Sequence, residues 1–379
     1  MIRRRLDWSC RLSGCALLGI LFAHAALAQD AALRPQLLVS LPDTCPTPDG
    51  MAIDADGNLV VACPNFADAT RPGCLIRINR QRRVTPWVQV PPLAETGHAY
   101  PMGIAFGPDG DLFVCDNQNW PTGNGPDGQQ NQGRLLRLRI RDGRIERTTV
   151  VAQQISHPNG VRVRGDYVYI TVSMLPKIRR EDGLLVSAVY RFRLDDQQVS
   201  LTNTRSDPNL LVAFVTLNRD CQYGADGLVF DSQGNLLVGN FGDGALHKVT
   251  FDSQGRVTGS TVFAKTDFAT PLSDPDFSSK MVRAKMRTTD GICIDGQDNV
   301  YVADFSNNAV CKVDPQGRIT VLAQSPDGDG GDGGLDQPGE PLLWDGKLVV
   351  TCFDMVTGPD KVNTKHDPPS TLSYLEWKP

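Results

Sequence analysis

Short apolar runs rich in Val, Ile and aromatic residues alternate along the chain with tight polar turns of Gly, Asp and Asn. The pattern is clearest between residues 288 and 324, where it predicts strands at 291–294, 299–304, 309–314 and 318–323. Such runs, bounded by turn residues, are typical of antiparallel strands joined by hairpins. Segments with the period of an amphipathic helix are almost absent. The pattern therefore predicts an all-β fold.

The same four-strand pattern recurs along the chain. Each copy opens with Pro-Asp-Gly or a variant of it, followed at once by an apolar strand. The marker residues of the copies, 49 to 67 residues apart, are Gly50, Gly103, Gly160, Gly227, Gly291 and Glu340. A four-stranded unit repeated at intervals of about 40–60 residues is typical of a β-propeller, because one such sheet cannot bury both faces alone. We therefore predict one six-bladed propeller domain over residues 29–379.

The first predicted strand of this domain has no partners beside it in the sequence. Residues 36–41 resemble the outermost strand of a blade, but no inner strands precede them. The last repeat lacks an outermost strand, because it has only three predicted strands, near 341–344, 347–352 and 371–377. Pairing the two would leave no open sheet edge in the ring. We therefore expect the N-terminal strand to complete the last blade.

The N-terminus has the features of a secretory signal peptide. Arg residues at 3, 4, 5 and 11 precede an apolar stretch, and Ala26-Leu27-Ala28 forms a small-x-small cleavage site. The apolar stretch is too short for a membrane-spanning helix. We predict removal of residues 1–28 and a periplasmic or secreted location. The whole chain has a net charge of −5, and loss of these arginines makes it more acidic, which argues against nucleic acid or a membrane surface as partner.

Eight cysteines lie beyond residue 28, and none forms a Cys-x-x-Cys pair. Export permits disulfides, but the sequence does not give their connectivity. Cys63 and Cys74 flank one strand connection and are our first candidate pair. Cys293 and Cys311 fall within predicted strands, where we expect buried thiols.

Loop lengths differ between the two faces of the predicted propeller. Turns between the first and second strands of a blade are short, as at 54–57 and 232–234. The long segments all fall in connections of the opposite face, at 117–133, 174–184, 265–289, 324–338 and 354–370. Long loops gathered on one rim of a rigid scaffold usually carry the binding site.

One position recurs just before the first strand of each blade, on the same rim, and at five of its six occurrences the side chain offers an oxygen. The six residues are Asp49, Met102, Asn159, Asp226, Asp290 and Glu340. Carboxylates crowded into one channel repel each other, and a bound cation removes that cost. Each Asp-Gly or Asn-Gly could alternatively serve only as a turn into the strand. As a set, Asp49, Asn159, Asp226, Asp290 and Glu340 predict a divalent-cation site, with Ca²⁺ as the first choice and Mg²⁺, Mn²⁺ or Zn²⁺ as alternatives.

Three of these motifs resemble a known family. Pro158-Asn159-Gly160, Ala225-Asp226-Gly227 and Gly339-Glu340, with Trp344 four residues after the Glu, resemble the gluconolactonase, senescence-marker and luciferin-regenerating enzyme family. This resemblance implies a six-bladed, metal-dependent hydrolase of lactones or related esters. It also implies cation ligation by Glu340, Asn159 and Asp226, with Asp226 as the base. Glu340 lies in the last repeat instead of the first, a shift that a closed ring tolerates. Two departures from the family pattern are that Pro341 sits one place early and that Met102 stands where the family often has a polar contact.

The expected mechanism is metal-assisted hydrolysis of a carboxylic ester by a monomeric enzyme. The expected partner is a small lactone or ester, with sugar-derived lactones among the candidates. His157 and His98 precede innermost strands and are candidate proton shuttles, unless they are solvated or structural histidines.

Two other functions remain open from the sequence. The first is a non-catalytic propeller that binds a ligand around a structural cation. The second is a quinone-dependent sugar dehydrogenase, which also uses six blades but needs a His- and Arg-lined pocket. The acidic ring argues against the second.

Overall fold

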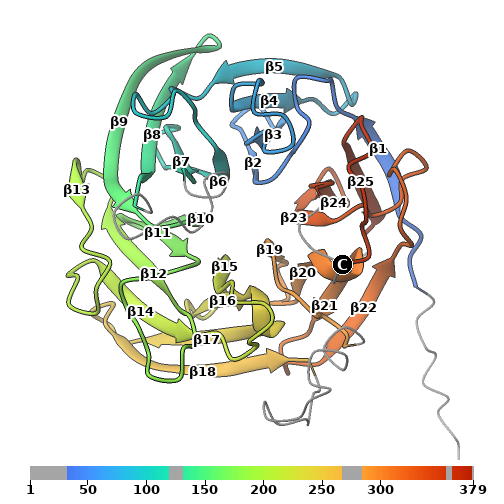
Figure 1. Cartoon of the computed structure of the whole chain (residues 1–379). Helices are drawn as coiled ribbons and strands as arrows, with labels where there is room; N and C mark the ends of the chain where they lie inside the picture. The colour runs from blue at the N-terminus through green and yellow to red at the C-terminus, as the bar shows by residue number, and fades with distance from the viewer. Residues whose placement is uncertain (1–31, 119–130, 267–283, 356–360, 378–379) are drawn as a thin grey trace, which may run out of the picture. The chain divides into compact units, whose positions relative to one another are not determined.

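The computed structural model describes residues 32–118, 131–266, 284–355 and 361–377. Its strands form six sheets that follow one another around a ring, each with four antiparallel strands from innermost to outermost (Figure 1). The predicted six-bladed propeller is therefore confirmed. The signal peptide predicted at residues 1–28 lies outside the described residues and stays a prediction.

The first three blades take up residues 51–215. Blade 1 consists of β2 (Met51–Ile53), β3 (Leu59–Cys63), β4 (Cys74–Ile78) and β5 (Val84–Gln89). Blade 2 consists of β6 (Pro101–Phe106), β7 (Leu112–Asp116), β8 (Gly133–Arg141) and β9 (Arg144–Ile155), with β13 (Val199–Ser200) added parallel to β9. Blade 3 consists of β10 (Pro158–Arg164), β11 (Tyr167–Val172), β12 (Val186–Arg193) and β14 (Leu210–Val215).

The remaining blades complete the ring. Blade 4 consists of β15 (Ala225–Phe230), β16 (Leu236–Asn240), β17 (Ala245–Phe251) and β18 (Val257–Lys265). Blade 5 consists of β19 (Ile292–Ile294), β20 (Val300–Asp304), β21 (Ala309–Val313) and β22 (Ile319–Gln324). Blade 6 consists of β23 (Pro338–Trp344), β24 (Lys347–Cys352), β25 (Thr371–Glu376) and β1 (Gln36–Ser40). Short 3₁₀ turns, η1 (Phe241–Asp243) and η2 (Phe305–Asn307), follow β16 and β20.

The ring closes as the sequence predicts. β1 pairs antiparallel with β25, with Gln36 opposite Tyr374 and Ser40 opposite Thr371. In Figure 1 the blue N-terminal strand lies at the outer edge of the red C-terminal blade. The first and last parts of the domain are thereby held in one sheet, so blade 6 has all four of its strands.

The hydrophobic core lies between blades. One buried cluster joins Ile104 and Leu112 of blade 2 to Val60 and Leu75 of blade 1. Each of the other blade junctions in the described ring has a similar cluster, including the junction of blades 6 and 1. Stacking therefore buries the sheet faces that a single blade would leave exposed.

Marker glycines bring the innermost strands close together at the rim. A side-chain carbon added to Gly160 would lie 2.6 Å from the carbonyl oxygen of Asp226 in the next blade, and one added to Gly227 would lie 2.6 Å from that of Asp290. Only Gly tolerates so close a backbone approach. The residue before each glycine is thus fixed at a constant place around the ring.

The other end of the innermost strands carries buried turn aspartates. Asp231 accepts hydrogen bonds from the backbone and side chain of Asn235, at 2.8 and 2.9 Å, and pairs with Lys248 at 2.9 Å. Asp295 likewise accepts hydrogen bonds from the backbone and side chain of Asn299, at 2.9 and 2.8 Å. These contacts define the short turns predicted between the first and second strands.

Among the described residues, no helix has the length and hydrophobicity needed to cross a bilayer.

Candidate functional site

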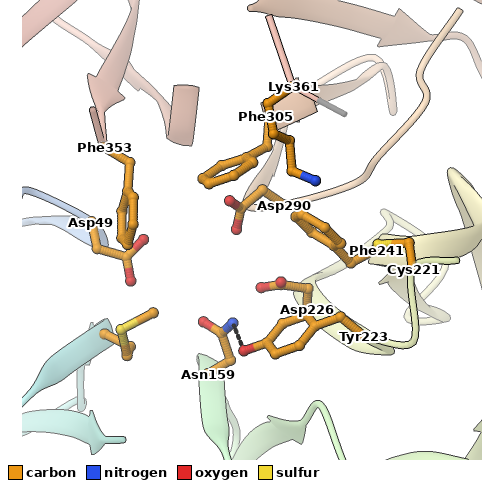
Figure 2. A pocket seen from close by; sticks show the side chains of 11 residues that line it. Asp49, Asn159, Cys221, Tyr223, Asp226, Phe241, Asp290, Phe305, Phe353 and Lys361 are labelled. Carbon is orange, nitrogen blue, oxygen red and sulfur yellow. Dashed lines mark hydrogen bonds between the residues drawn. The ribbon is translucent and has the colours of Figure 1, made fainter. Parts of the chain in front are cut away.

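A pocket opens at the rim end of the innermost strands, where the recurring oxygen-bearing residues were predicted to meet. Its polar lining is formed by Asp49, Asn159, Tyr223, Asp226, Asp290 and Lys361. Its apolar lining is formed by Met102, Cys221, Phe241, Phe305 and Phe353. Figure 2 shows the carboxyl groups of Asp49, Asp226 and Asp290 directed toward the same space. The structure therefore brings together residues from all six blades that are up to 312 positions apart, from Asp49 to Lys361.

The carboxyl groups of this pocket are buried close to one another, so their charged forms are disfavoured. Burial, and then the charge of Glu340, raises the pKa of Asp49 to about 8. Burial raises the pKa of Asp226 and of Asp290 well above the ordinary value, and the neighbouring carboxylates raise both further. The Asp49 oxygen Oδ2 is buried and accepts no hydrogen bond in the described structure. An uncompensated cluster of this kind favours a bound cation.

The side chain of Asn159 lines this pocket and is oriented by a hydrogen bond. Its nitrogen Nδ2 donates to the Tyr223 hydroxyl at 3.3 Å, and its oxygen is directed away from that ring (Figure 2). The Asp226 and Asp290 carboxyl groups also interact directly with each other. Amide and carboxylate oxygens on adjoining blades form a donor set that suits a hard cation.

Glu340 occupies a different position from the other predicted ligands. It is buried, but its oxygen Oε1 accepts a hydrogen bond from Arg162 Nη2 at 2.8 Å, and it is absent from the pocket lining given above. Burial raises the pKa of Glu340, whereas the charge of Arg162 opposes that rise. Glu340 therefore has a cationic partner within the protein, and its role as a metal ligand stays a prediction.

The pocket carboxylates surround a space without converging on one point. In the described part of the chain, no three of the carboxylates Asp49, Asp226, Asp290 and Glu340 bring their oxygens within 4.8 Å of one another. Two carboxylates, the Asn159 oxygen and water molecules would be enough for Ca²⁺, which accepts mixed oxygen ligands in flexible geometry. The residues present therefore fit a cation of this type.

A series of aromatic side chains in contact with one another reaches the pocket, a feature that the sequence prediction missed; Tyr223, Phe241, Phe305 and Phe353 of this series line the pocket. We call Phe66, Tyr100, Tyr223, Phe241, Phe305 and Phe353 the aromatic collar, in which successive ring centroids lie between 5.1 and 6.3 Å apart. A sequence signal exists, because Phe241, Phe305 and Phe353 each follow directly after the second strand of their blade. Rings at these separations stabilise one another and present an apolar surface above the carboxylates.

Neither histidine that was predicted to move protons lines the pocket. His157 is buried and lies edge-on to Tyr223, with ring centroids 6.4 Å apart. Burial lowers the pKa of His157 to about 4, so the ring is neutral at pH 7. His98 stacks on Tyr100 with centroids 5.7 Å apart. Both histidines contact tyrosines of the collar, and a catalytic role for either stays a prediction.

Solved structures with this architecture are found among several kinds of protein. The calcium-binding protein regucalcin of Agrobacterium tumefaciens matches with a TM-score of 0.53 at 13% identity, over 91% of this chain and 96% of that chain. A gluconolactonase of Xanthomonas campestris matches with a TM-score of 0.52 at 14% identity, over 92% and 96%. A PQQ-bound aldose sugar dehydrogenase of Streptomyces coelicolor matches with a TM-score of 0.54 at 14% identity, over 91% and 97%.

The structural neighbours thus include gluconolactonase and regucalcin propellers, as the sequence resemblance predicted. At these identities the likeness concerns the fold. No protein-family model and no curated protein matches the sequence. Because the same fold also occurs in a sugar dehydrogenase, the chemistry has to be argued from the pocket residues.

Proposed function

We propose that the protein is a divalent-cation-dependent hydrolase of lactones or related esters. The observation that carries the proposal is the set of buried carboxyl groups of Asp49, Asp226 and Asp290 around one pocket. The Asp49 oxygen Oδ2 has no hydrogen-bond partner among the described residues. Lys361 also lines the pocket, but one ammonium group does not balance three carboxylates. A divalent cation would supply the missing positive charge.

In this proposal the cation is held by Asp226, Asn159 and Asp290 or Asp49. When bound, it supplies Lewis acidity toward the ester carbonyl. Asp226 accepts the proton of the attacking water. Burial raises its pKa, so the residue is a stronger base once ionised than an exposed carboxylate.

The aromatic collar supplies the remaining contacts with the substrate. Phe241, Phe305 and Phe353 cover one side of the pocket with apolar surface, which suits the carbon face of a lactone ring. Their rings also keep bulk water away from the carboxylates, which strengthens electrostatic interactions inside the pocket. Tyr223 holds the Asn159 amide in place through its hydroxyl. We further propose a small-molecule substrate, action as a monomer, and a periplasmic or secreted location.

The main alternative is a non-catalytic propeller in which the same cation and collar bind a ligand without turning it over. The quinone-dependent alternative is disfavoured by the described pocket lining, which contains three carboxylates and neither His nor Arg.

A lactone panel tests the proposal. The purified protein is treated with a chelator, and hydrolysis of sugar lactones, alkyl lactones and aryl esters is followed before and after addition of Ca²⁺, Mg²⁺ or Mn²⁺. We expect turnover that is lost on chelation and restored by one of these ions. Ligand binding in calorimetry without turnover of any panel member would favour the binding propeller. Turnover that is indifferent to chelator would contradict the role of the cation.

A further inference from the structure

A second cluster of potential metal ligands lies outside the pocket lining, in blade 1 and in the connection that leads into it. The sulfur atoms of Cys45, Cys63 and Cys74 all lie within 4.8 Å of one another. Cys45 and Cys63 are fully buried, whereas Cys74 is partly exposed. None of the three is disulfide-bonded in this structure. Cys63 and Cys74, which the sequence suggested as a disulfide, are instead members of a group of three.

Separate segments bring these sulfurs together. Cys63 ends β3 and faces Cys74, the first residue of β4, across the antiparallel pair. Cys45 comes from the connection between β1 and β2, and its sulfur lies 3.8 Å from that of Cys74. The amide of Asn65 donates to the carbonyls of Thr44, at 3.1 Å, and Pro72, at 2.8 Å. This residue therefore fixes the segments that carry Cys45 and Cys74 relative to each other.

The spacing of the sulfurs matches what one thiophilic ion requires. With a metal–sulfur bond of about 2.3 Å, two thiolates of a tetrahedral site lie about 3.8 Å apart, and two of a trigonal site about 4.0 Å apart. The Cys45–Cys74 separation of 3.8 Å fits this value. A disulfide needs only two sulfurs, at about 2.0 Å, and gives no reason for a third to converge on them.

We propose that Cys45, Cys63 and Cys74 bind a thiophilic d¹⁰ cation, Zn²⁺ or Cu⁺, as three thiolate ligands. Soft sulfur ligands select these ions over Ca²⁺ and Mg²⁺, so the cluster would not compete with the oxygen-lined pocket for its cation. Partial exposure of Cys74 provides access from solvent.

The position of the cluster indicates a structural role. Cys45 lies between β1, which completes blade 6, and β2, which begins blade 1. Cys45 and Cys63 also belong to the hydrophobic cluster that joins these two blades. A bound ion would therefore fasten the chain at the junction where the ring closes, and its free energy of binding would stabilise the closed ring.

Metal loading of the full chain tests the proposal. Protein kept reduced with a non-thiol reductant is titrated with Zn²⁺, or with Cu⁺ under anaerobic conditions, and bound metal is measured after gel filtration. We expect one equivalent of one of these ions, with a thiolate-to-metal charge-transfer band in the ultraviolet. Only a thiolate site gives this band, so the Asp226→Asn variant, which changes the oxygen-lined pocket, should retain it.

Matched variants identify the ligands. Cys74→Ser and Cys63→Ser should each lose the bound equivalent and the band, whereas Cys311→Ser, which changes a buried thiol on β21 of blade 5, should keep both. Should a ligand variant fail to fold, alkylation of the wild-type protein gives the same information. Bound metal should protect Cys45, Cys63 and Cys74, but not Cys221, which is partly exposed.

Two results would overturn the proposal. One is a reduced protein that takes up neither ion at the thiolate site, or a Cys74→Ser variant that keeps the band. The other is a freshly purified, unreduced protein with two fewer free thiols than cysteines and with the missing pair mapped to this cluster, which would show a disulfide in place of the ion site.

Discussion

The innermost strands carry buried aspartates at both of their ends, and the two sets are treated very differently by the fold. The rim aspartates are Asp49, Asp226 and Asp290, and the turn aspartates, each five residues further along, are Asp54, Asp231 and Asp295. All six are buried, with exposed fractions between 2% and 9%. Burial alone therefore cannot explain how the two sets differ.

The difference lies in their partners. Burial raises the pKa of the Asp231 carboxyl, but its contacts with Lys248 and Asn235 outweigh burial and lower the pKa overall. Hydrogen bonds outweigh burial in the same way at Asp295, where the pKa is also lowered. Asp54 pairs with Arg77 at 2.9 Å. The rim aspartates have raised pKa values because burial and like charges act without comparable compensation.

A repeated aspartate in this propeller therefore has one of two roles, according to its partners. The turn aspartates stabilise the fold from within, because their charges and hydrogen bonds are satisfied by the chain. The rim aspartates cost folding free energy unless something outside the chain compensates them. Residues that a fold keeps at such a cost are candidates for function.

Strand β15 contains Asp226 and is directly followed by Asp231, so variants of these two residues compare the rim and turn sets on one strand. The largest expected effect is on catalysis. Asp226→Asn should lower lactone hydrolysis by about 10²–10⁴-fold, because the general base is removed. Its free energy of unfolding at pH 7 should stay the same or rise, because a disfavoured charge is lost. Steady-state kinetics and denaturant unfolding measure the two quantities. Retained turnover would remove Asp226 from the mechanism.

Asp231→Ala, five residues away, should show the reverse behaviour. We expect a loss of about 1.5–3 kcal/mol in the free energy of unfolding, because a charged hydrogen-bond acceptor for Asn235 and Lys248 is removed. Hydrolysis per folded molecule should be unchanged. Asp231→Asn, which keeps one acceptor oxygen, serves as the control and should lose less. If Asp231→Ala lowered the free energy of unfolding no more than substitution of an exposed surface residue does, the turn contacts would not stabilise the fold.

The pH dependence of stability should separate the two sets without any mutation. A carboxyl group whose pKa is raised in the folded state binds its proton more tightly there than in the unfolded chain, so it makes stability fall as pH rises between the unfolded and folded pKa values. For Asp49 this window runs from the ordinary value of 3.8 to about 8. Asp231 and Asp295, whose pKa values are lowered, should instead cost stability below about pH 4, near the ordinary Asp value.

Urea unfolding across this range, in the presence of chelator, measures the trend. A divalent cation that binds the pocket should offset the decline toward pH 8, with a gain of about 2.7 kcal/mol at 100 times its dissociation constant. Asp49→Asn should reduce the decline even without cation. A profile that is flat from pH 4 to 8 with chelator, both in wild type and in Asp49→Asn, would contradict the uncompensated charge.

The smallest effect on the free energy of unfolding is expected for a turn contact whose arginine partner is exposed to solvent. Asp314 pairs with Arg318 at 2.6 Å, but the arginine side chain is 79% exposed. Arg318→Ala should change the free energy of unfolding by less than about 0.5 kcal/mol, because solvent screens exposed ion pairs. Thermal unfolding of this variant beside Asp231→Ala measures the contrast. A comparable loss in both would show that burial of the turn is not what gives these contacts their strength.

The architecture could be predicted from the sequence, because local and repeated patterns specify the strands and turns of each blade. Alternating apolar runs and Asp-Gly or Asn-Gly turns predicted the strands of blade 5 to within one residue of β19, β20, β21 and β22. The deficit of one strand in the last repeat predicted the pairing of β1 with β25. The recurrent residue before each marker glycine predicted which side chains meet at the rim, since a closed repeat sends equivalent positions to one axis.

Which of these side chains share an environment became clear only from the folded ring. Glu340 carries the same kind of signal as Asp226, yet its carboxylate is paired with Arg162, 178 positions away, and is not part of the pocket lining. The aromatic collar and the three-cysteine cluster also depend on side chains from different blades or segments. Charge compensation and ring contacts act through space between residues that no local spacing relates, so their partners follow from the folded ring and not from the order of the residues along the chain.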